Sequence, residues 1–536
     1  MSLRDIFIRG ASLIDGTGKE RRRADIVVRS GRIAHVGVLR TPPPGAEVIA
    51  ADGLIVAPGF IDHHQHGDIT ALVDPRCLSA LAQGVTSIVV GNCGHGVAPG
   101  LDPSLAGLAL IGYRSDWGVE LRWSSYAEYL SALASAAPAI NVGALAAHGA
   151  IRMAVVGTQA RPATAEERRH IEDLVDEAMR AGALGLSSGL EYSPGRYADT
   201  DELVGLCKVV ARYDGTYASH IRNRAEDFAA ACQEAISIAE FGGVRLVLSH
   251  LAPRPYAPQG TLHSVLDLIA GARARGLPVT IDTFPDVWGP SPLASLLPPH
   301  VLLSTADLVA RTLRDADVRT EVVTSFNRRE NFLLRAGDMT ELRLTSSDAH
   351  PELVGMTLAE IATDKGQHPG EIVCDLLADD GTDLYSVLIQ HRYATAQDLD
   401  TLMLNPECAF ESDGVVACAD GVLSRFTMNR STYGYAPRVL GELVRERRLL
   451  SLEEAIRKMT SLPADALGLV DRGRIVEGAV ADVVIFDEAT VADRCTDKVP
   501  RAYPAGIHTV LVGGQVAWRN NALGAARAGT ILRLNA

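Results

Sequence analysis

The chain has 536 residues, of which 47% are apolar and 22% are charged, and 51 Lys and Arg residues against 65 Asp and Glu residues leave a formal charge of −14. This composition is typical of a globular protein with a full hydrophobic core, and the length allows several domains or one large enzyme barrel with attached parts. The acidic excess, without a basic tract, argues against nucleic acid and anionic membranes as partners, because both bind clustered Lys and Arg.

The first residues and the cysteines indicate the compartment. Met1–Ile14 lacks the charged leader and apolar core of a secretory signal, so we expect a cytoplasmic protein. The eight cysteines are scattered without a Cys-x-x-Cys pair, which argues against a disulfide framework. The uncharged stretch Leu130–Ile151 is long enough to span a membrane, but Pro138, Asn141 and His148 interrupt it. We therefore predict the end of a helix and a buried strand there.

Short β-branched segments at both ends of the chain predict a small β domain. The expected strands are Asp5–Ile14, Ala24–Val28, Arg32–Val36 and Glu47–Ala50 near the start, and Asp482–Phe486, Ile507–Val512 and Gln515–Trp518 near the end. We expect residues 1–58 and 475–536 to form one β-sandwich domain beside the main fold.

Between these ends, short apolar runs repeatedly finish in a polar residue. The residues at the ends of these eight runs are Asp62, Cys93, His148, Ser188, His220, His250, Asp282 and Asp413. Helical segments such as Arg168–Ala181 and Glu226–Phe241 separate the runs. Repeated strand–helix units with polar strand ends predict an α/β fold, a (β/α)8 TIM-like barrel, over residues 59–309 and 401–474. The long stretch before Asp413 exceeds one such unit, so we expect an α-rich insertion over residues 310–400.

Five of the residues near these strand ends are potential metal ligands. His64 and His66 are two positions apart on an extended segment, so both imidazoles can face one ion, although an isolated pair of this kind is a modest signal. Cys93, His220 and His250 follow other strands of the same predicted barrel, and these residues should converge at its mouth. A thiolate with imidazoles favours zinc over magnesium or calcium.

Asp413, which follows the eighth predicted strand, is a candidate general base. A carboxylate at that position can take a proton from metal-bound water and return it to a leaving nitrogen. An ordinary turn aspartate before Gly414 is the alternative, and position alone leaves both open. Asp282 has the same ambiguity, and His95 and His148 are expected to support the site rather than bind the ion.

Several segments match sequence motifs of one enzyme family. They are Ala57–His66, Gly91–Gly94, Gly182–Leu190, Ser219–Arg222, Leu248–His250, Met459–Ala464, Asp471–Gly473 and Gly478–Asp482. The first of these resembles the strand-one signature of the amidohydrolase superfamily. The Cys93 segment, in place of a carboxylated lysine, resembles the N-acyl-D-amino-acid deacylase (D-aminoacylase) branch.

The resemblance implies a zinc-dependent hydrolase that cleaves the amide bond of an N-acyl-D-amino acid, with metal-bound hydroxide as nucleophile. It implies a tight zinc site formed by Cys93, His220 and His250, and a second, weaker position at His64 and His66. It also implies that Asp413 is the general base and acid, and that Tyr192 polarises the scissile carbonyl.

Three departures from the family pattern affect the group that would hold the substrate carboxylate. The lysine expected after His250 is absent, Phe284 replaces a tyrosine, and Arg430 follows Met428-Asn429 where the family has His-Pro. Ser291 is a remaining carboxylate contact.

These departures leave alternatives open for the substrate. Either Arg254, Arg222, Arg224 or Arg430 supplies a new cation, or the substrate is a different amide that is neutral, cyclic or a ureide. A noncatalytic scaffold is a further alternative, which the complete ligand set opposes. The expected partner is a small-molecule amide, and the sequence leaves a homo-oligomer open.

Overall fold

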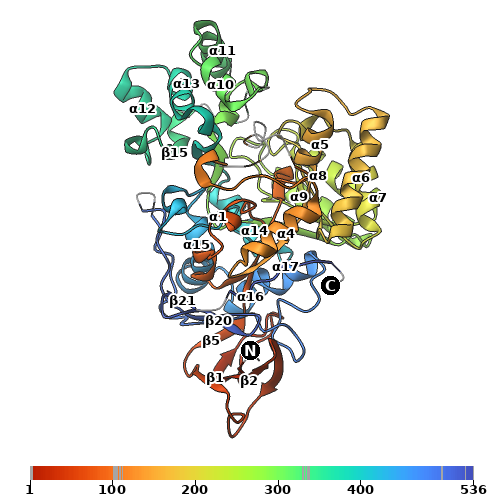
Figure 1. The fold of residues 1–536 in the computed structure, drawn as a ribbon, viewed down its shortest axis with the longest axis vertical. Helices are drawn as coiled ribbons and strands as arrows, with labels where there is room; N and C mark the ends of the chain where they lie inside the picture. The colour runs from red at the N-terminus through yellow and green to blue at the C-terminus, as the bar shows by residue number, and fades with distance from the viewer. Residues whose placement is uncertain are drawn as a thin grey trace.

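The computed structural model describes residues 4–100, 107, 110, 113–302, 304–328, 331, 333–334, 338–496, 499–524 and 527–534. A β domain, a central barrel and a helical insertion follow one another along the long axis of the molecule (Figure 1). The strands β1 and β2 lie at one end, and the helices of the insertion lie at the other. The predicted fold class, a (β/α)8 barrel with a β domain from both chain ends and an insertion, is confirmed.

Both ends of the chain contribute to one nine-stranded sheet. Its strands are β1 (Ile6–Leu13), β2 (Arg22–Arg29), β3 (Arg32–Gly37), β4 (Glu47–Ala50), β5 (Ile55–Pro58), β18 (Val483–Phe486), β19 (Ile507–Val512), β20 (Gln515–Arg519) and β21 (Ala522–Leu523). The order is β21-β20-β19-β18-β5-β1-β2-β3, with β4 beside β1. The antiparallel pairing of β5 with β18 joins the two ends. Ile6, Ile8 and Leu13 of β1 enter a core that belongs to this sheet.

Eight parallel strand positions form the barrel. They are β6 (Phe60–Asp62), β7 (Val85–Val90), β8 (Asn141–Ala144) continued by β9 (Ala146–Ala147), β10 (Gly185–Gly189), β11 (Thr216–His220), β12 (Arg245–Leu248), β13 (Val279–Thr283) and β17 (Cys408–Phe410). The ring closes where the backbone N–H of His66 donates to the carbonyl of Gly414 at 2.8 Å. Most of these strands are buried on both faces, as expected when helices surround a parallel sheet.

Helices cover the outside of the barrel. They are α1 (Thr70–Val73), α2 (Leu78–Leu81), α4 (Tyr126–Ala136), α5 (His148–Val156), α6 (Ala165–Ala181), α7 (Thr200–Ala211), α8 (Phe228–Gly242), α9 (Thr261–Ala274), α14 (Ala396–Leu404), α15 (Ser431–Arg438), α16 (Leu452–Met459) and α17 (Ser461–Ala466). α6 shows how the sequence sets such a helix: Thr164 and Glu167 form a capping box, and Gly182 ends it with a φ of 107°. Ile171 and Val175 are its buried face.

The insertion leaves the barrel directly after β13 and has its own core. It contains the antiparallel strands β14 (Trp288–Pro292), β15 (Leu342–Ser346) and β16 (Leu388–Arg392), and the helices α10 (Ala306–Thr312), α11 (Ala316–Arg328), α12 (Leu358–Lys365) and α13 (Pro369–Asp380). Its buried apolar cluster runs from Leu293 to Ile389. Strands β14 and β16 therefore connect the insertion to the barrel.

The C-terminal residues return to the end of the barrel opposite the strand carboxyl ends. Val142 of β8 donates to the carbonyl of Thr530 and accepts from the N–H of Leu532, each at 2.9 Å. Leu532 packs in the cluster that contains Ile61 and Val89. This face of the barrel is thereby covered, and the other face remains for a site. Among the helices in the described part of the chain, none combines the length and apolar character that crossing a membrane requires.

Candidate active site

The carboxyl ends of the barrel strands bring together the predicted ligands. His64 and His66 follow β6, Cys93 lies in a short 3-10 turn after β7, His220 ends β11 and His250 follows β12. All five side chains are at most 5% exposed. Although they span nearly 190 residues of sequence, they form one cluster, because parallel barrel strands end at the same face.

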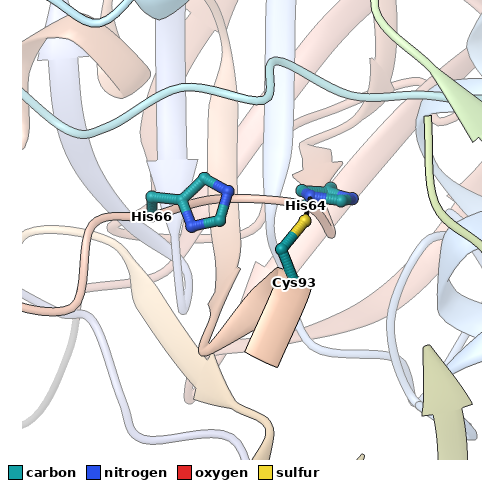
Figure 2. A group of neighbouring side chains, drawn as sticks. All are labelled: His64, His66 and Cys93. Atoms are coloured by element: carbon teal, nitrogen blue, oxygen red, sulfur yellow. Dashed lines mark hydrogen bonds between the residues drawn. The ribbon is translucent and has the colours of Figure 1, made fainter. Parts of the chain in front are cut away.

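Cys93 is the centre of this cluster. Its Sγ lies 3.2 Å from Nε2 of His64 and 3.3 Å from Nε2 of His250. Nδ1 of His220 lies 3.0 Å from Nε2 of His250. Figure 2 shows His64 and His66 on one segment, with the sulfur of Cys93 directed at the His64 ring. Cys93 belongs to two groups of potential metal ligands, one with His64 and His66 and one with His220 and His250.

Glycines allow the turn that carries Cys93. Cys93 itself has a φ of 54°, and Gly91 and Gly94 on either side have φ values of 79° and 69°, a left-handed conformation that glycine adopts most easily. A Cβ on Gly189 would lie 2.0 Å from the carbonyl oxygen of Cys93, and one on Gly149 would lie 2.6 Å from that of Gly94. Two missing side chains therefore let the turn approach β10 and α5.

The charge state of Cys93 suits a metal ligand. Burial alone would raise the pKa of the thiol, but the imidazoles of His64 and His250 hold the pKa well below its ordinary value. The thiolate is the form that binds metal. Nδ1 of His66 is buried without a hydrogen-bond partner among the residues that the structure describes. Zinc holds sulfur and nitrogen ligands at about 2.3 and 2.0 Å, which places tetrahedral ligand atoms about 3.3–3.7 Å apart. The Cys93–His250 distance of 3.3 Å lies at the edge of that range and the His220–His250 distance of 3.0 Å is slightly shorter, so small shifts of these side chains would accommodate the ion.

Buried carboxylates orient the imidazoles. Glu191 accepts a hydrogen bond from Nε2 of His220 at 2.9 Å, which leaves Nδ1 of that ring as the ligand atom. Asp282 lies 3.4 Å from Nδ1 of His64 and 3.3 Å from Nε2 of His63, and it also accepts from the backbone N–H of His250. Carboxylates in these positions fix ring orientation at metal sites. Asp282 thus contacts the ligands rather than forming a simple turn.

Asp413 contacts the histidines of the same cluster. Its Oδ1 lies 3.2 Å from Nε2 of His66 and 3.8 Å from Nε2 of His64. Burial opposes its ionisation, but the contact with His66 keeps the pKa of Asp413 below its ordinary value. The backbone of Asp413 has a φ of 42° and its N–H donates to the Glu411 carboxyl group. Burial raises the pKa of Glu411 well above its ordinary value, so the pKa values of the two neighbouring carboxyl groups are shifted apart.

Tyr192 lies beside the ligand His220. The ring centroids of Tyr192 and His220 are 4.6 Å apart, and that of His95 lies 5.0 Å from Tyr192. Burial, together with Cys93 and Glu191, raises the pKa of Tyr192 well above its ordinary value. The phenol therefore keeps its proton and can donate a hydrogen bond.

The predicted carboxylate contacts lie in two different environments. Arg254 is 3% exposed and donates to Glu191 at 2.8 Å and to Nε2 of His391 at 3.1 Å. Ser291 lies 3.4 Å from Nδ1 of the same His391. Arg430 contacts a different set of residues: it pairs with Asp286 at 3.5 Å and with Asp493 at 3.3 Å.

Phe284 is part of the packing beneath the site. It is fully buried, and its ring centroid lies 4.4 Å from that of Tyr393. The Tyr393 hydroxyl donates to the carbonyl of His250 at 2.5 Å. The guanidinium of Arg224 lies over the Tyr393 ring at 5.0 Å and donates to the same carbonyl at 3.3 Å.

Comparison with known proteins shows the family of this chain. The sequence profile described as "Amidohydrolase family" matches residues 47–237 and 316–518. The chain is 36% identical to N-acyl-D-glutamate deacylase of Alcaligenes xylosoxydans xylosoxydans, over 99% of this chain and 97% of that protein. The chain belongs to the amidohydrolase family. It is a metal-dependent amidohydrolase of the D-aminoacylase group, which confirms the resemblance found in the sequence.

Two further relatives support this amidohydrolase assignment. D-aminoacylase of the same Alcaligenes organism is 33% identical over 98% of this chain and 97% of that protein. The crystal structure of N-acyl-D-glutamate deacylase from Bordetella bronchiseptica, complexed with zinc and a phosphonate inhibitor, superimposes with a TM-score of 0.82. That structure is 33% identical, and the match covers 99% of this chain and all of the other.

Sequence reasoning did not assign roles to several residues of this amidohydrolase site. Glu191 follows β10 and Glu411 follows β17, and neither has a sequence motif of its own that indicates its role. His391 and Tyr393 lie at the end of β16, inside the insertion. Strand β16 pairs antiparallel with β14, where His391 lies opposite Gly289. The sequence pattern that predicts parallel barrel strands does not predict this pairing.

Proposed function

We propose that this amidohydrolase hydrolyses N-acyl-D-amino acids to a carboxylate and a D-amino acid, with zinc as its metal. The observation that carries the proposal is the convergence of Cys93, His220 and His250 with Asp413 at one barrel mouth. The relatives named for D-glutamate and other D-amino acids support this substrate class.

Zinc would be held by Cys93, His220 and His250, with His64 and His66 forming a second, weaker position. A zinc ion bound there supplies Lewis acidity, which acidifies water and polarises a carbonyl oxygen. The low pKa of the Cys93 thiol and the hydrogen bond from His220 to Glu191 prepare these side chains as ligands. One tight site is expected because this triad combines the Cys93 sulfur with two imidazoles from two other strands, whereas His64 and His66 follow the same strand.

Asp413 moves the proton in this proposal. It is ionised at neutral pH, so it can accept the proton of the attacking water, and it can then return that proton to the leaving amide nitrogen. His66 holds the carboxylate in place at 3.2 Å. Tyr192 keeps its phenolic proton and donates to the carbonyl oxygen, where negative charge develops.

Arg254, Ser291 and His391 would bind the substrate carboxylate. An arginine can only donate, so Nε2 of His391 accepts from Arg254 and Nδ1 of His391 carries the proton toward Ser291. The oxygen of Ser291 then accepts a hydrogen bond from His391, and the O–H of Ser291 can donate to the substrate carboxylate. Two buried arginines, Arg224 and Arg254, both interact with Glu191, and Arg224 also interacts with Asp413, so cationic groups lie beside the proposed carboxylate receptor. Phe284 would support this region through Tyr393.

Hydrolysis of a panel of N-acyl-D-amino acids, their L forms and carboxylate-free amides tests the proposal. We expect preference for the D-acyl compounds. Arg254→Met should raise KM for them by about 10- to 100-fold, since charge-assisted hydrogen bonds are lost, and should leave the carboxylate-free amides unchanged. Arg430→Met is the matched control. The metal content of Arg254→Met shows whether Glu191 still orients His220 in that variant. Fast turnover of only neutral, cyclic or ureide amides would overturn the substrate class.

The thiols support a cytoplasmic location for this enzyme. All eight cysteines are free and buried in the described structure. Free thiols persist in reducing compartments. A small-molecule amide is the proposed partner, and sedimentation of the purified protein tests for a homo-oligomer.

A further inference from the structure

A cavity of about 290 Å³ lies between the barrel mouth and the insertion. The loop after β10 forms one wall, which includes Tyr192 and Pro194, and the segment after β14 forms the other, which includes Leu296, Leu297 and Leu302. The volume is close to the lower end of the range of about 300–1,000 Å³ found for pockets that bind drug-sized molecules. It greatly exceeds what an acetyl group fills.

The cavity borders the reaction centre through Tyr192. The ring of Tyr192 lines the cavity and lies 4.6 Å from the ring of His220. His95 also lines it, and its ring lies 5.9 Å from that of His66. A smaller void between Cys93 and Gly189 is lined by the same His95 and Tyr192. A group attached to a carbonyl carbon at the metal cluster can therefore extend past Tyr192 into the larger cavity.

The chemistry of the walls favours a hydrocarbon. The wall from the insertion contains leucines and prolines, and Tyr385 and Met153 add further apolar surface. Two charged side chains on the barrel wall are paired, Glu191 with Arg254 at 2.8 Å and Arg222 with Glu234 at 2.9 Å, and the third, Arg196, is exposed to solvent. An apolar ligand group therefore displaces water without separating either ion pair.

We propose that this cavity binds the acyl group of the substrate, and that the enzyme prefers large apolar acyl groups, aliphatic or aromatic, over acetyl. This rests on the proposed function. The acyl group, rather than the amino-acid side chain, is the occupant because it is bonded directly to the carbonyl that Tyr192 contacts. The amino-acid side chain branches beside the carboxylate, and none of Arg254, Ser291 and His391 lines the cavity.

A series of one D-amino acid carrying acyl groups from acetyl to decanoyl tests the proposal. Each buried methylene is worth about fourfold in binding, so kcat/KM should rise steeply with chain length until the cavity is full. Lengthening the amino-acid side chain with acetyl kept constant should have a smaller effect. The opposite pattern, a steep rise with the side chain and a flat response to the acyl chain, overturns the assignment.

Ser295→Trp provides the matching structural test. Ser295 is half-buried and lines the cavity, so an indole there should fill it and reduce the ratio of kcat/KM for octanoyl to acetyl substrates tenfold or more. Leu308→Trp, on the exposed surface of α10, is the control and should leave the ratio unchanged. Octanoate is the carboxylate product of the octanoyl substrate. Its binding, measured by calorimetry, should weaken in Ser295→Trp and stay unchanged in Leu308→Trp.

The outcomes separate the two proposals. An unchanged ratio in Ser295→Trp, with a flat chain-length series on an active enzyme, overturns the acyl pocket and leaves the deacylase function standing. Absence of hydrolysis for every acyl length overturns the proposed function itself. Retained hydrolysis of the acetyl substrate by Ser295→Trp shows that the variant is folded.

Discussion

The Glu191 carboxylate contacts Nε2 of the His220 imidazole at 2.9 Å and Nη2 of Arg254 at 2.8 Å. Burial opposes ionisation of Glu191, but Arg254 and His220 hold its pKa far below the ordinary value. One carboxylate thereby links a candidate metal ligand to the candidate carboxylate receptor.

Glu191→Gln should weaken metal binding by about 10- to 100-fold, because partners that orient ligating imidazoles contribute this much. Competition with a chromogenic chelator measures the affinity. Glu166→Gln, at an exposed position in the first turn of α6, is the control. Unchanged affinity in Glu191→Gln would show that His220 needs no carboxylate to face the metal.

Cys93→Ser should reduce the tightly bound zinc from about one ion per chain to a small fraction, because a hydroxyl stays protonated where the thiol ionises. Elemental analysis after dialysis gives the metal content. Cys495→Ser is a suitable control, since Cys495 is buried, belongs to none of the potential ligand groups in the described structure, and donates to the carbonyl of Ala502 at 3.4 Å. Full zinc occupancy in Cys93→Ser contradicts the assigned ligand.

Asp413→Asn should lower kcat by about 10²- to 10⁴-fold, since an amide cannot carry the proton from water to the leaving nitrogen. Zinc content and the thermal midpoint should stay close to those of the parent, as the amide retains the shape of the side chain. Turnover within threefold of the parent would exclude Asp413 as the proton carrier.

Glu202→Gln should lower the free energy of unfolding by about 3–5 kcal/mol, because it leaves the buried Arg152 guanidinium without a counter-charge. The side chains of Arg152 and Glu202 are both 0% exposed, and His148 contacts the same carboxylate at 2.9 Å. Denaturant unfolding of the parent, Glu202→Gln and the surface variant Glu166→Gln measures the change. A loss below 1 kcal/mol would mean that water or another group compensates the arginine.

The same pair predicts a pH dependence. Burial opposes ionisation, but His148 and Arg152 lower the pKa of Glu202 from 4.5 to about 2. A folded-state pKa below the unfolded value stabilises the fold above the unfolded pKa, and this stabilisation is lost as the pH falls through the folded value. The stability difference between the parent and Glu202→Gln should therefore be full above pH 4.5 and shrink toward pH 2.

The sequence was sufficient to predict the barrel and the clustering of its polar strand ends, because both depend on local patterns. The apolar run before His64 and the turn glycines around Cys93 can be identified from the sequence alone. Glu191, His391 and Tyr393 could not be assigned in this way. Their roles depend on which loop meets which strand in space, and that information is absent from periodicity.

The insertion shows the same limit. Its helices α12 and α13 are visible as apolar patterns with capping residues such as Thr357. Strand β14 contains two prolines, Pro290 and Pro292, and reads as a loop. Antiparallel pairing with β16 nevertheless makes it a strand, since proline can occupy the edge of a sheet.

The pairing of β5 with β18 has a consequence for synthesis. At about 5–20 residues per second, residues Ile55–Pro58 emerge from the ribosome tens of seconds before Val483–Phe486. During that interval the N-terminal strands expose an unpaired edge, which is a template for aggregation. Nascent chains of this protein should therefore depend on chaperones more than a homologous barrel without the split sheet, and the dependence should end only when the final strands are released.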